Sequence, residues 1–354
     1  MCFSDLGQGM AAEGLDSAYD MSELWILELL GGLRASPKVV RHADEMAALA
    51  VRERPDVAIL IDSWGFTLRV AQRLKAQLPD MPVIKYVAPQ VWASRPGRAA
   101  VLARHVDHLL SIHTFDAPYF EKVGLPTTFV GNSTLSLDLS AADPVALRRR
   151  LAIGPDEPVL VVLPGSRPSE IARVLPPFEE AVALLKTARP GLQVIVPAAA
   201  TVADAVKARV AGWPYRAHVV EGEADRYAAM KAATVALACS GTVTTELALA
   251  GAPMVVGYRL GPVTYAILKR LIRTDYVTLF NIAAQDFVAP ELIQADCNGP
   301  RIAREIARRL DDPDLRRAQV DAQDKALAQM GRGGPDPSEA AARAVLKVLG
   351  RAAA

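Results

Sequence analysis

An α/β fold with two doubly wound parallel sheets is the architecture that this 354-residue sequence predicts. The first observation is that its apolar segments are continuous runs of Val, Ile and Leu, as strands covered on both faces require. The second is that each run leads into a loop of small or polar residues and then into an amphipathic, helix-like stretch. The predicted strands form two series: residues 57–61, 82–88, 108–112 and 127–131, then 158–164, 192–198, 217–222, 234–239 and 253–258.

The division between the two series predicts two Rossmann-like domains. The AADP stretch at residues 141–144 separates them, so we expect one domain over residues 1–140 and a second over residues 141–335, facing each other across a cleft. A Gly/Pro-rich hinge then precedes a helical pattern over residues 336–354. Two placements of this last helix remain open, because it can cross back to brace the first domain or pack on the second.

Composition narrows the class of protein. The chain is 51% apolar and 22% charged, typical of a soluble globular protein, and its 40 Lys and Arg against 39 acids give no support for a nucleic-acid partner. Cys2, Cys239 and Cys297 are too widely spaced for a disulfide framework, which suits a reducing cytoplasm. The sequence has no apolar run of the roughly 20 residues that a membrane span needs and no signal-peptide pattern. We therefore expect a cytoplasmic protein that can still touch a membrane surface.

Two loops of the second half have the composition of an anion site. The run 158–164 ends in a loop containing Ser166 and Arg167, in which backbone amides, a hydroxyl and a guanidinium can grip phosphate oxygens. Ser240, Gly241 and Thr242 leave another strand and open a helix, whose first N–H groups are unpaired. Each loop alone is more simply explained as helix capping. Both together favour a nucleotide diphosphate.

One helical turn after the second loop, Glu246 is placed to accept hydrogen bonds from ribose hydroxyls. Neither loop matches the GxxxxGK[ST] pattern, so ATP hydrolysis finds no support. His105, His108 and His113 cluster in sequence without Cys or acid residues at metal-ligand spacing. We therefore expect neither a metal nor another cofactor.

In the first half, Asp62 directly follows the strand run 57–61. A carboxylate there is a general base, a helix cap or a solvated loop charge, and the pattern alone leaves these three open. Gln90, Trp92 and Arg95 follow the next run and can line a sugar site, although a buried tryptophan is the simpler explanation.

Two stretches mix cations with large apolar residues. Residues 257–281 carry Arg259, Lys269, Arg270 and Arg273, and residues 23–34 carry Trp25. A basic, apolar helix can lie on an anionic bilayer and admit acyl chains. It can equally pack in a core while its cations reach solvent, and both interpretations stay open.

The resemblance to a known family rests on stretches spread over nearly the whole chain: ILIDSWGFTLRVA, KYVAPQVWASRPGR, TTFVGN, LPGSRPSEI, VPAAATV, ACSGTVTTELAL, PMVVGYR and RTDYVTLFN. In this order and spacing they resemble the lipid-A-disaccharide synthase family of inverting GT-B glycosyltransferases. The resemblance implies that UDP-2,3-diacylglucosamine is joined to 2,3-diacylglucosamine 1-phosphate, with release of UDP. It also implies catalysis without a metal at the inner face of the cytoplasmic membrane. The oligomeric state, a homodimer included, stays open.

The resemblance also implies roles for individual residues. Asp62 matches the family's essential aspartate and would take the proton of the acceptor hydroxyl as general base. Arg167 matches its required arginine, which would stabilise charge on the departing UDP. The other substrate-binding residues implied by the matched stretches are Gln90, Ser166, Glu170, Ser240, Gly241, Thr242, Glu246 and Asn281.

One departure from the family pattern concerns the N-terminus. The family opens with a strand and a Gly-Glu-x-Ser-Gly-Asp loop that this sequence lacks. An open sheet without that strand would expose neighbouring apolar residues, so we expect the true start to lie upstream. Two alternatives remain: another GT-B enzyme acting on UDP-GlcNAc, such as a 2-epimerase, or a truncated, inactive form that still binds UDP or membrane.

Overall fold

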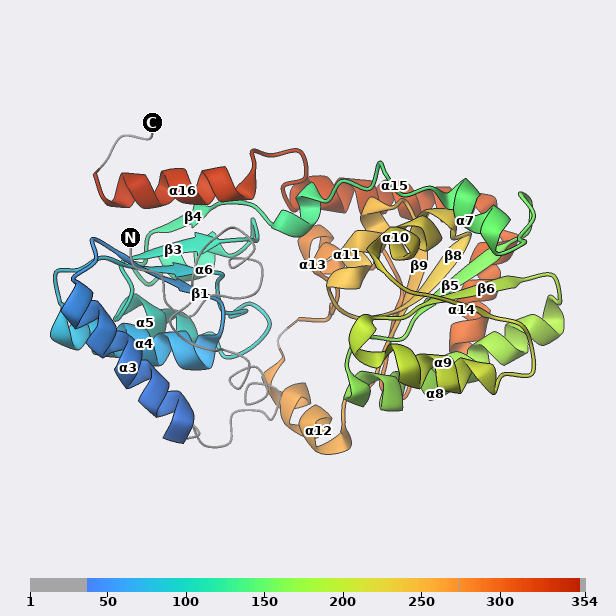
Figure 1. Cartoon of the computed structure of the whole chain (residues 1–354), viewed down its shortest axis with the longest axis horizontal. Helices are drawn as coiled ribbons and strands as arrows, with labels where there is room; N and C mark the ends of the chain where they lie inside the picture. Colours follow the sequence, from blue (N-terminus) through green and yellow to red (C-terminus); the bar gives the residue numbers. More distant parts are fainter. Residues whose placement is uncertain (1–36, 273, 351–354) are drawn as a thin grey trace. The chain divides into compact units, whose positions relative to one another are not determined.

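The computed structural model describes residues 37–272 and 274–350, without the side chains of residues 263, 267 and 268. The chain divides into two compact units (Figure 1). The first unit is Met1–Gly131 together with Pro335–Ala354, and the second is Asn132–Gly334. Each unit contains its own parallel sheet, with four and six described strands. The predicted fold class, α/β with two parallel sheets, is therefore confirmed.

The first unit is built on strands in the order β1-β2-β3-β4, all parallel. Its strands are β1 (Ala58–Ile61), β2 (Val83–Tyr86), β3 (His108–Ser111) and β4 (Thr127–Phe129). Its helices are α3 (Pro37–Glu53), α4 (Trp64–Gln77), α5 (Arg98–Ala103), α6 (Ala117–Glu121) and α16 (Pro337–Val348). Among the described strands, β1 pairs only with β2, and the side chains of Ile59 and Ile61 are 43% and 41% exposed.

Two separate apolar clusters cover the two faces of this sheet. Val83 and Leu109 pack with α3, α4 and α5, whereas the next residues along each strand, Ile84 and Leu110, pack with Ala344 of α16. Successive side chains of a strand point to opposite faces, so one strand supplies both clusters. The last helix of the chain thus belongs to the first unit, although the whole of the second unit separates it in sequence from β4.

The second unit has the strand order β10-β9-β8-β5-β6-β7, again all parallel. Its strands are β5 (Val159–Leu163), β6 (Gln193–Pro197), β7 (His218–Val220), β8 (Val235–Cys239), β9 (Met254–Tyr258) and β10 (Glu291–Ile293). Its longer helices are α8 (Pro168–Ala188), α9 (Ala203–Ala211), α10 (Glu223–Ala232), α11 (Thr242–Leu249), α12 (Pro262–Leu271), α14 (Gly299–Asp311) and α15 (Pro313–Gln329). Its shorter ones are η1 (Ser133–Ser136), α7 (Pro144–Arg150), η2 (Ala200–Val202) and α13 (Leu279–Ala284).

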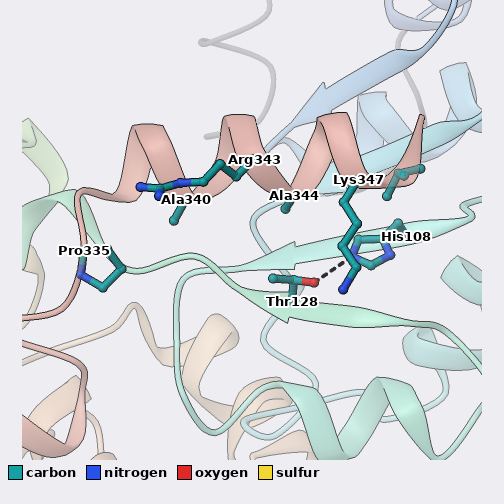
Figure 2. Close-up of a pocket in the computed structure, with 8 residues that line it drawn as sticks. His108, Thr128, Pro335, Ala340, Arg343, Ala344 and Lys347 are labelled. Atoms are coloured by element: carbon teal, nitrogen blue, oxygen red, sulfur yellow. Dashed lines mark hydrogen bonds between the residues drawn. The ribbon is translucent and has the colours of Figure 1, made fainter. Parts of the chain in front are cut away.

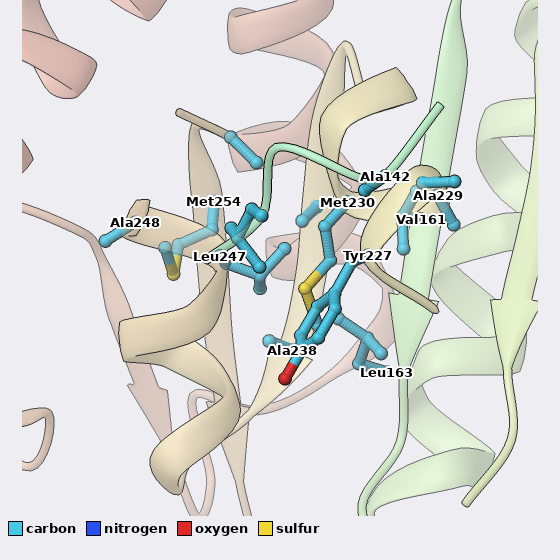
Figure 3. Close-up of a cluster of buried hydrophobic side chains, with 14 of the residues drawn as sticks. Ala142, Val161, Leu163, Tyr227, Ala229, Met230, Ala238, Leu247, Ala248 and Met254 are labelled. Carbon is cyan, nitrogen blue, oxygen red and sulfur yellow. The ribbon is translucent and has the colours of Figure 1, made fainter. Parts of the chain in front are cut away.

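Burial on both faces of this sheet explains its continuous apolar strands. Every residue of β5 and β8 is buried. Val161 and Leu163 contribute to one cluster with α10 and α11 (Figure 3), while Leu160 and Val162 contribute to another with α8 and α14. Each of the nine predicted strand runs contains one observed strand, but β10 was not predicted. No helix in the described part of the chain combines the length and the apolar character needed to span a bilayer.

Candidate functional site

Asp62 lies at the carboxyl end of β1, in a backbone conformation that non-glycine residues seldom adopt. Asp62 has φ 47° and Ser63 has φ 42°, so two consecutive residues are left-handed. Such conformations each cost on the order of 1–3 kcal/mol and persist only where the surroundings enforce them. The Asp62 amide donates to the carbonyl of Tyr86 at 2.9 Å, which continues the sheet pairing to this residue. Asp62 is exposed, so its carboxylate is accessible at the carboxyl ends of the strands, where α/β proteins bind ligands.

The loops that follow β2 and β3 meet in an aromatic cluster. The indole Nε1 of Trp92 donates to Oδ1 of Asp116 at 3.1 Å, and its ring lies edge-on to Phe115 at 5.3 Å. His113 stacks on Phe115 with a centroid distance of 5.1 Å. Trp92 is therefore half-buried and held in place, while Gln90, two residues earlier, is exposed.

Asp116 is a buried acid that the sequence did not single out. It is 0% exposed, and its Oδ2 accepts no hydrogen bond from the described residues. Burial raises the pKa of Asp116 to about 7, against smaller opposing effects of hydrogen bonds from Trp92 and His113. Burial also lowers the pKa of the neighbouring His113 to about 4. Both groups therefore favour their neutral forms, as expected where charge is poorly solvated.

In the second unit, the loop after β5 is a candidate anion seat around the start of α8. Gly165 has φ 115°, and Arg167 is the N-cap residue of the helix. The backbone amides of Ser166 and Arg167 donate to Oε2 of Glu170 at 3.2 and 3.3 Å. The guanidinium of Arg167 donates to the other carboxylate oxygen at 3.0 Å. Two amides and a guanidinium thus converge on one carboxylate, the arrangement that also suits a phosphate group.

The loop after β8 lies next to this anion seat, because β5 and β8 are paired parallel neighbours. Gly241 is the N-cap residue of α11, and Thr242, the first helical residue, is exposed. Burial raises the pKa of the adjacent Cys239 thiol, and the charge of Glu170 raises it further. The effect of the Glu170 charge on Cys239 and the pairing of β5 with β8 both indicate that the two loops are close to each other. Both loops thus follow the carboxyl ends of paired strands of the second unit, and a shared anion site of Arg167 and residues 240–242 stays a prediction.

Glu246 lies on α11, and its side chain is largely buried. It is 9% exposed, and burial raises its pKa, with an opposing effect from Arg226. Nη1 of Arg226 lies 3.5 Å from Oε2 of Glu246, and the same guanidinium stacks over the Tyr227 ring at 4.7 Å. Oε2 of Glu246 is itself buried and accepts no hydrogen bond from the described residues. Arg226 was not predicted, because its relation to Glu246 depends on two helices meeting.

Asn281 has a different environment from that expected of a ligand-binding residue. Its side chain is 0% exposed, donates to the Ala289 carbonyl and to Glu291 at 2.9 Å each, and accepts from the Ala289 amide at 3.1 Å. Glu291 on β10 also accepts from the amides of Val277 and Thr278 at 2.8 and 2.6 Å. These bonds fasten α13 to β10. The expected contact of Asn281 with substrate stays a prediction.

The proposed membrane residues are only partly described. Lys269 and Arg270 are exposed in the last turn of α12, and Arg259 is half-buried after β9. Trp25 and Arg273 lie outside the described residues. In residues 37–272 and 274–350, no group of three or more His, Cys, Asp and Glu residues is arranged to hold a metal ion.

A hollow of about 510 Å³ in the first unit is distinct from the region of Asp62. It lies between α16 and the sheet and is lined by His108, Thr128, Arg343 and Lys347 among others (Figure 2). His108 is the first residue of β3, and it bonds to the Thr128 hydroxyl at 2.9 Å. The hollow therefore lies along α16, on the face of the sheet that this helix covers, whereas Asp62 follows the carboxyl end of β1.

Comparison with solved structures places this chain in the class of GT-B-like proteins. A UDP-GlcNAc 2-epimerase from Neisseria meningitidis bound to UDP-GlcNAc matches 96% of this chain and 87% of its own, with TM-score 0.64 and 12% identity. A structure titled S. aureus MnaA-UDP co-structure matches 96% and 86%, with TM-score 0.61 and 13% identity. At such low identity these likenesses concern the fold alone.

Sequence comparison then identifies the family within that class. The family model described as Lipid-A-disaccharide synthetase matches residues 3–345. The lipid-A-disaccharide synthase of Rhodospirillum centenum is 43% identical over 343 residues, 97% of this chain and 86% of the relative. That of Paramagnetospirillum magneticum is 41% identical over 345 residues, 97% and 88% of the two chains. The chain belongs to the lipid-A-disaccharide synthetase family.

The predicted activity is confirmed by this membership. The protein is an enzyme, a glycosyltransferase with lipid-A-disaccharide synthase activity, and its substrates are lipid A precursors. The 2-epimerase alternative left open by the sequence is not supported, since those enzymes share the fold at 12–14% identity while the synthases share 38–43% of the aligned residues.

Proposed function

We propose that the chain transfers 2,3-diacylglucosamine from UDP to the 6-hydroxyl of 2,3-diacylglucosamine 1-phosphate, with Asp62 as the general base. The acceptor hydroxyl gives its proton to the Asp62 carboxylate as its oxygen bonds to the anomeric carbon. The bond from that carbon to the UDP oxygen breaks, and UDP leaves with the bonding electrons. Attack opposite the leaving group inverts the configuration, so the product is the β-1,6-linked disaccharide.

The single observation that carries this proposal is the exposed carboxylate of Asp62 in its left-handed turn after β1. A strained, exposed acid at the ligand-binding edge of an α/β sheet is a common feature of functional sites. A helix cap is the simpler alternative for an acid before a helix. However, Ser63 rather than Asp62 is the N-cap residue of α4, and it makes no side-chain cap hydrogen bond.

The second unit supplies groups suited to the UDP moiety. The amides of Ser166 and Arg167 and the Arg167 guanidinium now hold a carboxylate, so a diphosphate would exchange with Glu170 for the same donors. The start of α11 would add further amides, with Ser240, Gly241 and Thr242 at the phosphates. Without a metal, these donors must stabilise the charge that develops on departing UDP. Glu246, which lies beside Arg226, is proposed to accept hydrogen bonds from the ribose hydroxyls.

We assign the acceptor to the first unit and the UDP-sugar to the second, with catalysis at the inner face of the cytoplasmic membrane. The exposed cations Lys269 and Arg270 on α12 suit anionic headgroups, and the apolar residues around them suit acyl chains. Gln90, exposed after β2, is proposed to contact the sugar. A homodimer stays a prediction.

The test is UDP release from the two diacylated sugars by wild type, Asp62→Asn and Asp80→Asn. Asp80 is the matched control, because it is also exposed in the first unit but precedes β2 at the opposite sheet edge. We expect Asp62→Asn to lower kcat by roughly 10²–10⁴-fold and Asp80→Asn to leave it unchanged. Wild-type turnover by Asp62→Asn would refute the base.

A parallel measurement separates binding from chemistry. UDP at a hundredfold excess over its Kd should stabilise wild type and Asp62→Asn equally, by about 2.7 kcal/mol. Unacylated UDP-GlcNAc should not be consumed. UDP stabilisation of the wild type without any turnover would favour the alternative of a silent UDP-binding form.

A further inference from the structure

A buried lysine on the neighbouring strand β2 contacts the turn that presents Asp62, and neither a strand pattern nor capping explains its burial. Lys85 lies on β2 and is 2% exposed. In the sheet register it is opposite Leu60, and the next residue, Tyr86, is opposite Ile61 at the end of β1. Lys85 is therefore beside the point where the chain leaves β1. Lysine is almost never fully buried unless its ammonium group is paired, so its position here needs a specific reason.

The ammonium group of Lys85 contacts the backbone of the turn itself. Its Nζ donates to the carbonyl oxygen of Asp62 and to Oγ1 of Thr67, the latter at 3.1 Å. The Thr67 hydroxyl in turn lies 2.8 Å from the carbonyl oxygen of Asp62 and 2.9 Å from that of Ser63, both in donor geometry. Thr67, on the first turn of α4, is 5% exposed.

These bonds act on the two residues whose φ angles are unusual. A left-handed residue turns its carbonyl away from the direction that an extended strand would give it, so that carbonyl needs a new donor. Lys85 and Thr67 together supply donors to both carbonyls of the turn. Since backbone orientation at Asp62 sets the direction of its side chain, the same bonds set where the carboxylate points.

We propose that Lys85, acting with Thr67, is a positioning residue for Asp62 in the glycosyl transfer reaction. The proposal rests on the proposed function of Asp62 as general base. The Lys85 ammonium group touches neither substrate, and its effect runs through the carbonyl oxygen of Asp62. A base displaced by about 1 Å from its proton can lose on the order of 10²-fold in rate. Loss of the ammonium group should therefore lower kcat and leave substrate affinity unchanged.

The principal test compares Lys85→Met with Lys75→Met. Methionine keeps the length and apolar stem of the side chain and removes the ammonium group. Lys75 is the matched control, because its Nζ also bonds to backbone carbonyls of the first unit, at Pro79 and Met81, but at the other end of α4. We expect Lys85→Met to lower kcat by roughly 10–100-fold with KM for both sugars within about twofold of wild type. Lys75→Met should leave kcat unchanged.

A double-mutant cycle with Asp62→Asn shows whether the effect runs through Asp62. If it does, Lys85→Met in the Asp62→Asn background should cost less than about threefold in kcat. An equal cost in both backgrounds would overturn the proposal, because a purely structural effect would be additive. Wild-type turnover by Asp62→Asn would instead refute the base itself, so the two failures are distinguishable.

Variants of Thr67 provide a second test of the proposal in case Lys85→Met does not fold. Thr67→Val has the same shape without the hydroxyl, and Thr67→Ser keeps the hydroxyl. We expect Thr67→Val to lower kcat by about tenfold and Thr67→Ser to retain it, with melting temperatures recorded for both. Wild-type kcat in a folded Thr67→Val or a folded Lys85→Met would overturn the proposal.

Discussion

The two units build the same kind of strand–loop–helix junction in opposite ways. After β5, the unusual backbone conformation falls on Gly165, with φ 115°, and a Cβ there would lie 2.8 Å from Oε2 of Glu170. After β1, it falls on Asp62 and Ser63, which both carry side chains. The junction after β5 presents backbone amides, for which glycine is best suited. The junction after β1 presents the Asp62 carboxylate, so the residue there carries a side chain and cannot be glycine.

The two units also differ in the solvent exposure of the charged residues near these junctions. Arg167, at the junction of the second unit, has a side chain that is 54% exposed, and it pairs with a carboxylate one helical turn away. Lys85 and Asp116, near the junctions of the first unit, are 2% and 0% exposed. The proposed phosphate-binding cation of the second unit thus stays in contact with solvent. The polar groups of the first unit are instead buried and form hydrogen bonds within that unit.

Of the variants that test this difference between the two units, Arg167→Ala should have the largest effect on activity. Removal of the guanidinium takes away the stabilisation of charge on departing UDP, so we expect kcat/KM to fall by about 10²–10³-fold. Stability should hardly change, because exposed ion pairs contribute little. Steady-state kinetics and a thermal melt measure the two.

The matched control for this variant is Arg173→Ala, one to two turns further along α8, where the side chain is also exposed. Its kinetics should be those of the wild type. Equal losses in the two variants would indicate a general effect of charge on the helix. Arg167→Lys should recover only part of the rate, since lysine lacks the planar two-pronged donor geometry.

Asp116→Asn tests the buried acid of the first unit by its pH dependence. Because burial raises the pKa of Asp116 from 3.8 to about 7, its contribution to stability is complete below pH 3.8 and is lost as pH rises through 7. His113 has the opposite sign, since its pKa is lowered from 6.5 to about 4, and its contribution is lost as pH falls through 4. Between pH 5 and 7, Asp116→Asn should gain stability relative to wild type by as much as about 3 kcal/mol.

Denaturant unfolding of both proteins at pH 5 and pH 7.5 measures this difference. Asparagine cannot ionise, so the change in the free energy of unfolding between the two pH values is the informative quantity. Any constant cost of the amide to stability is the same at both pH values and cancels in that difference. Parallel stability profiles for the two proteins would contradict the assignment of a proton to buried Asp116.

Gly165→Ala should disturb the junction of the second unit. The left-handed φ penalises any side chain, and the new methyl group would meet the Glu170 carboxylate, so we expect a loss of about 1–3 kcal/mol in stability and weaker UDP binding. Gly191→Ala is the control, because no heavy atom lies within 4 Å of a Cβ there. Thermal melts with and without UDP test both, and equal shifts would argue against the role of Gly165.

The smallest effect is expected from Ser63→Gly, the converse change in the first unit. Glycine relieves a left-handed strain of about 1 kcal/mol, but it adds about as much backbone entropy to the unfolded chain. Stability should therefore change by less than about 0.5 kcal/mol. A loss above 1 kcal/mol in a denaturant titration would show that the serine side chain, rather than the backbone conformation, stabilises the turn.

Sequence patterns were sufficient where the signal is local and repeated. The continuous apolar runs predicted nine strands, because parallel strands buried on both faces tolerate few polar residues. The run before Gly165-Ser166-Arg167 and the Ser-Gly-Thr segment indicated the two helix starts of the anion seat. Strand β10, Glu291–Ile293, was missed because Pro290 and Glu291 interrupt the apolar residues there, so the segment contains no continuous apolar run.

The environment of individual polar residues could not be predicted in this way. Lys85 stands in the run KYVA and resembles any strand residue, yet its Nζ holds the carbonyl of Asp62. Asp116 and Trp92 lie 24 residues apart in sequence and bond directly. The hydrogen bonds of the Asn281 amide group to Ala289 and Glu291 could not be foreseen from its sequence position.

The sequence by itself determined the class of fold, the family and the residue types at the strand ends, because hydrophobic periodicity and motif order are properties of neighbouring residues. Only the tertiary structure decided which of the polar residues are buried and what they bond to. That depends on parallel strands bringing distant loops to one edge of each sheet, where desolvation and hydrogen bonding act between residues far apart in the chain.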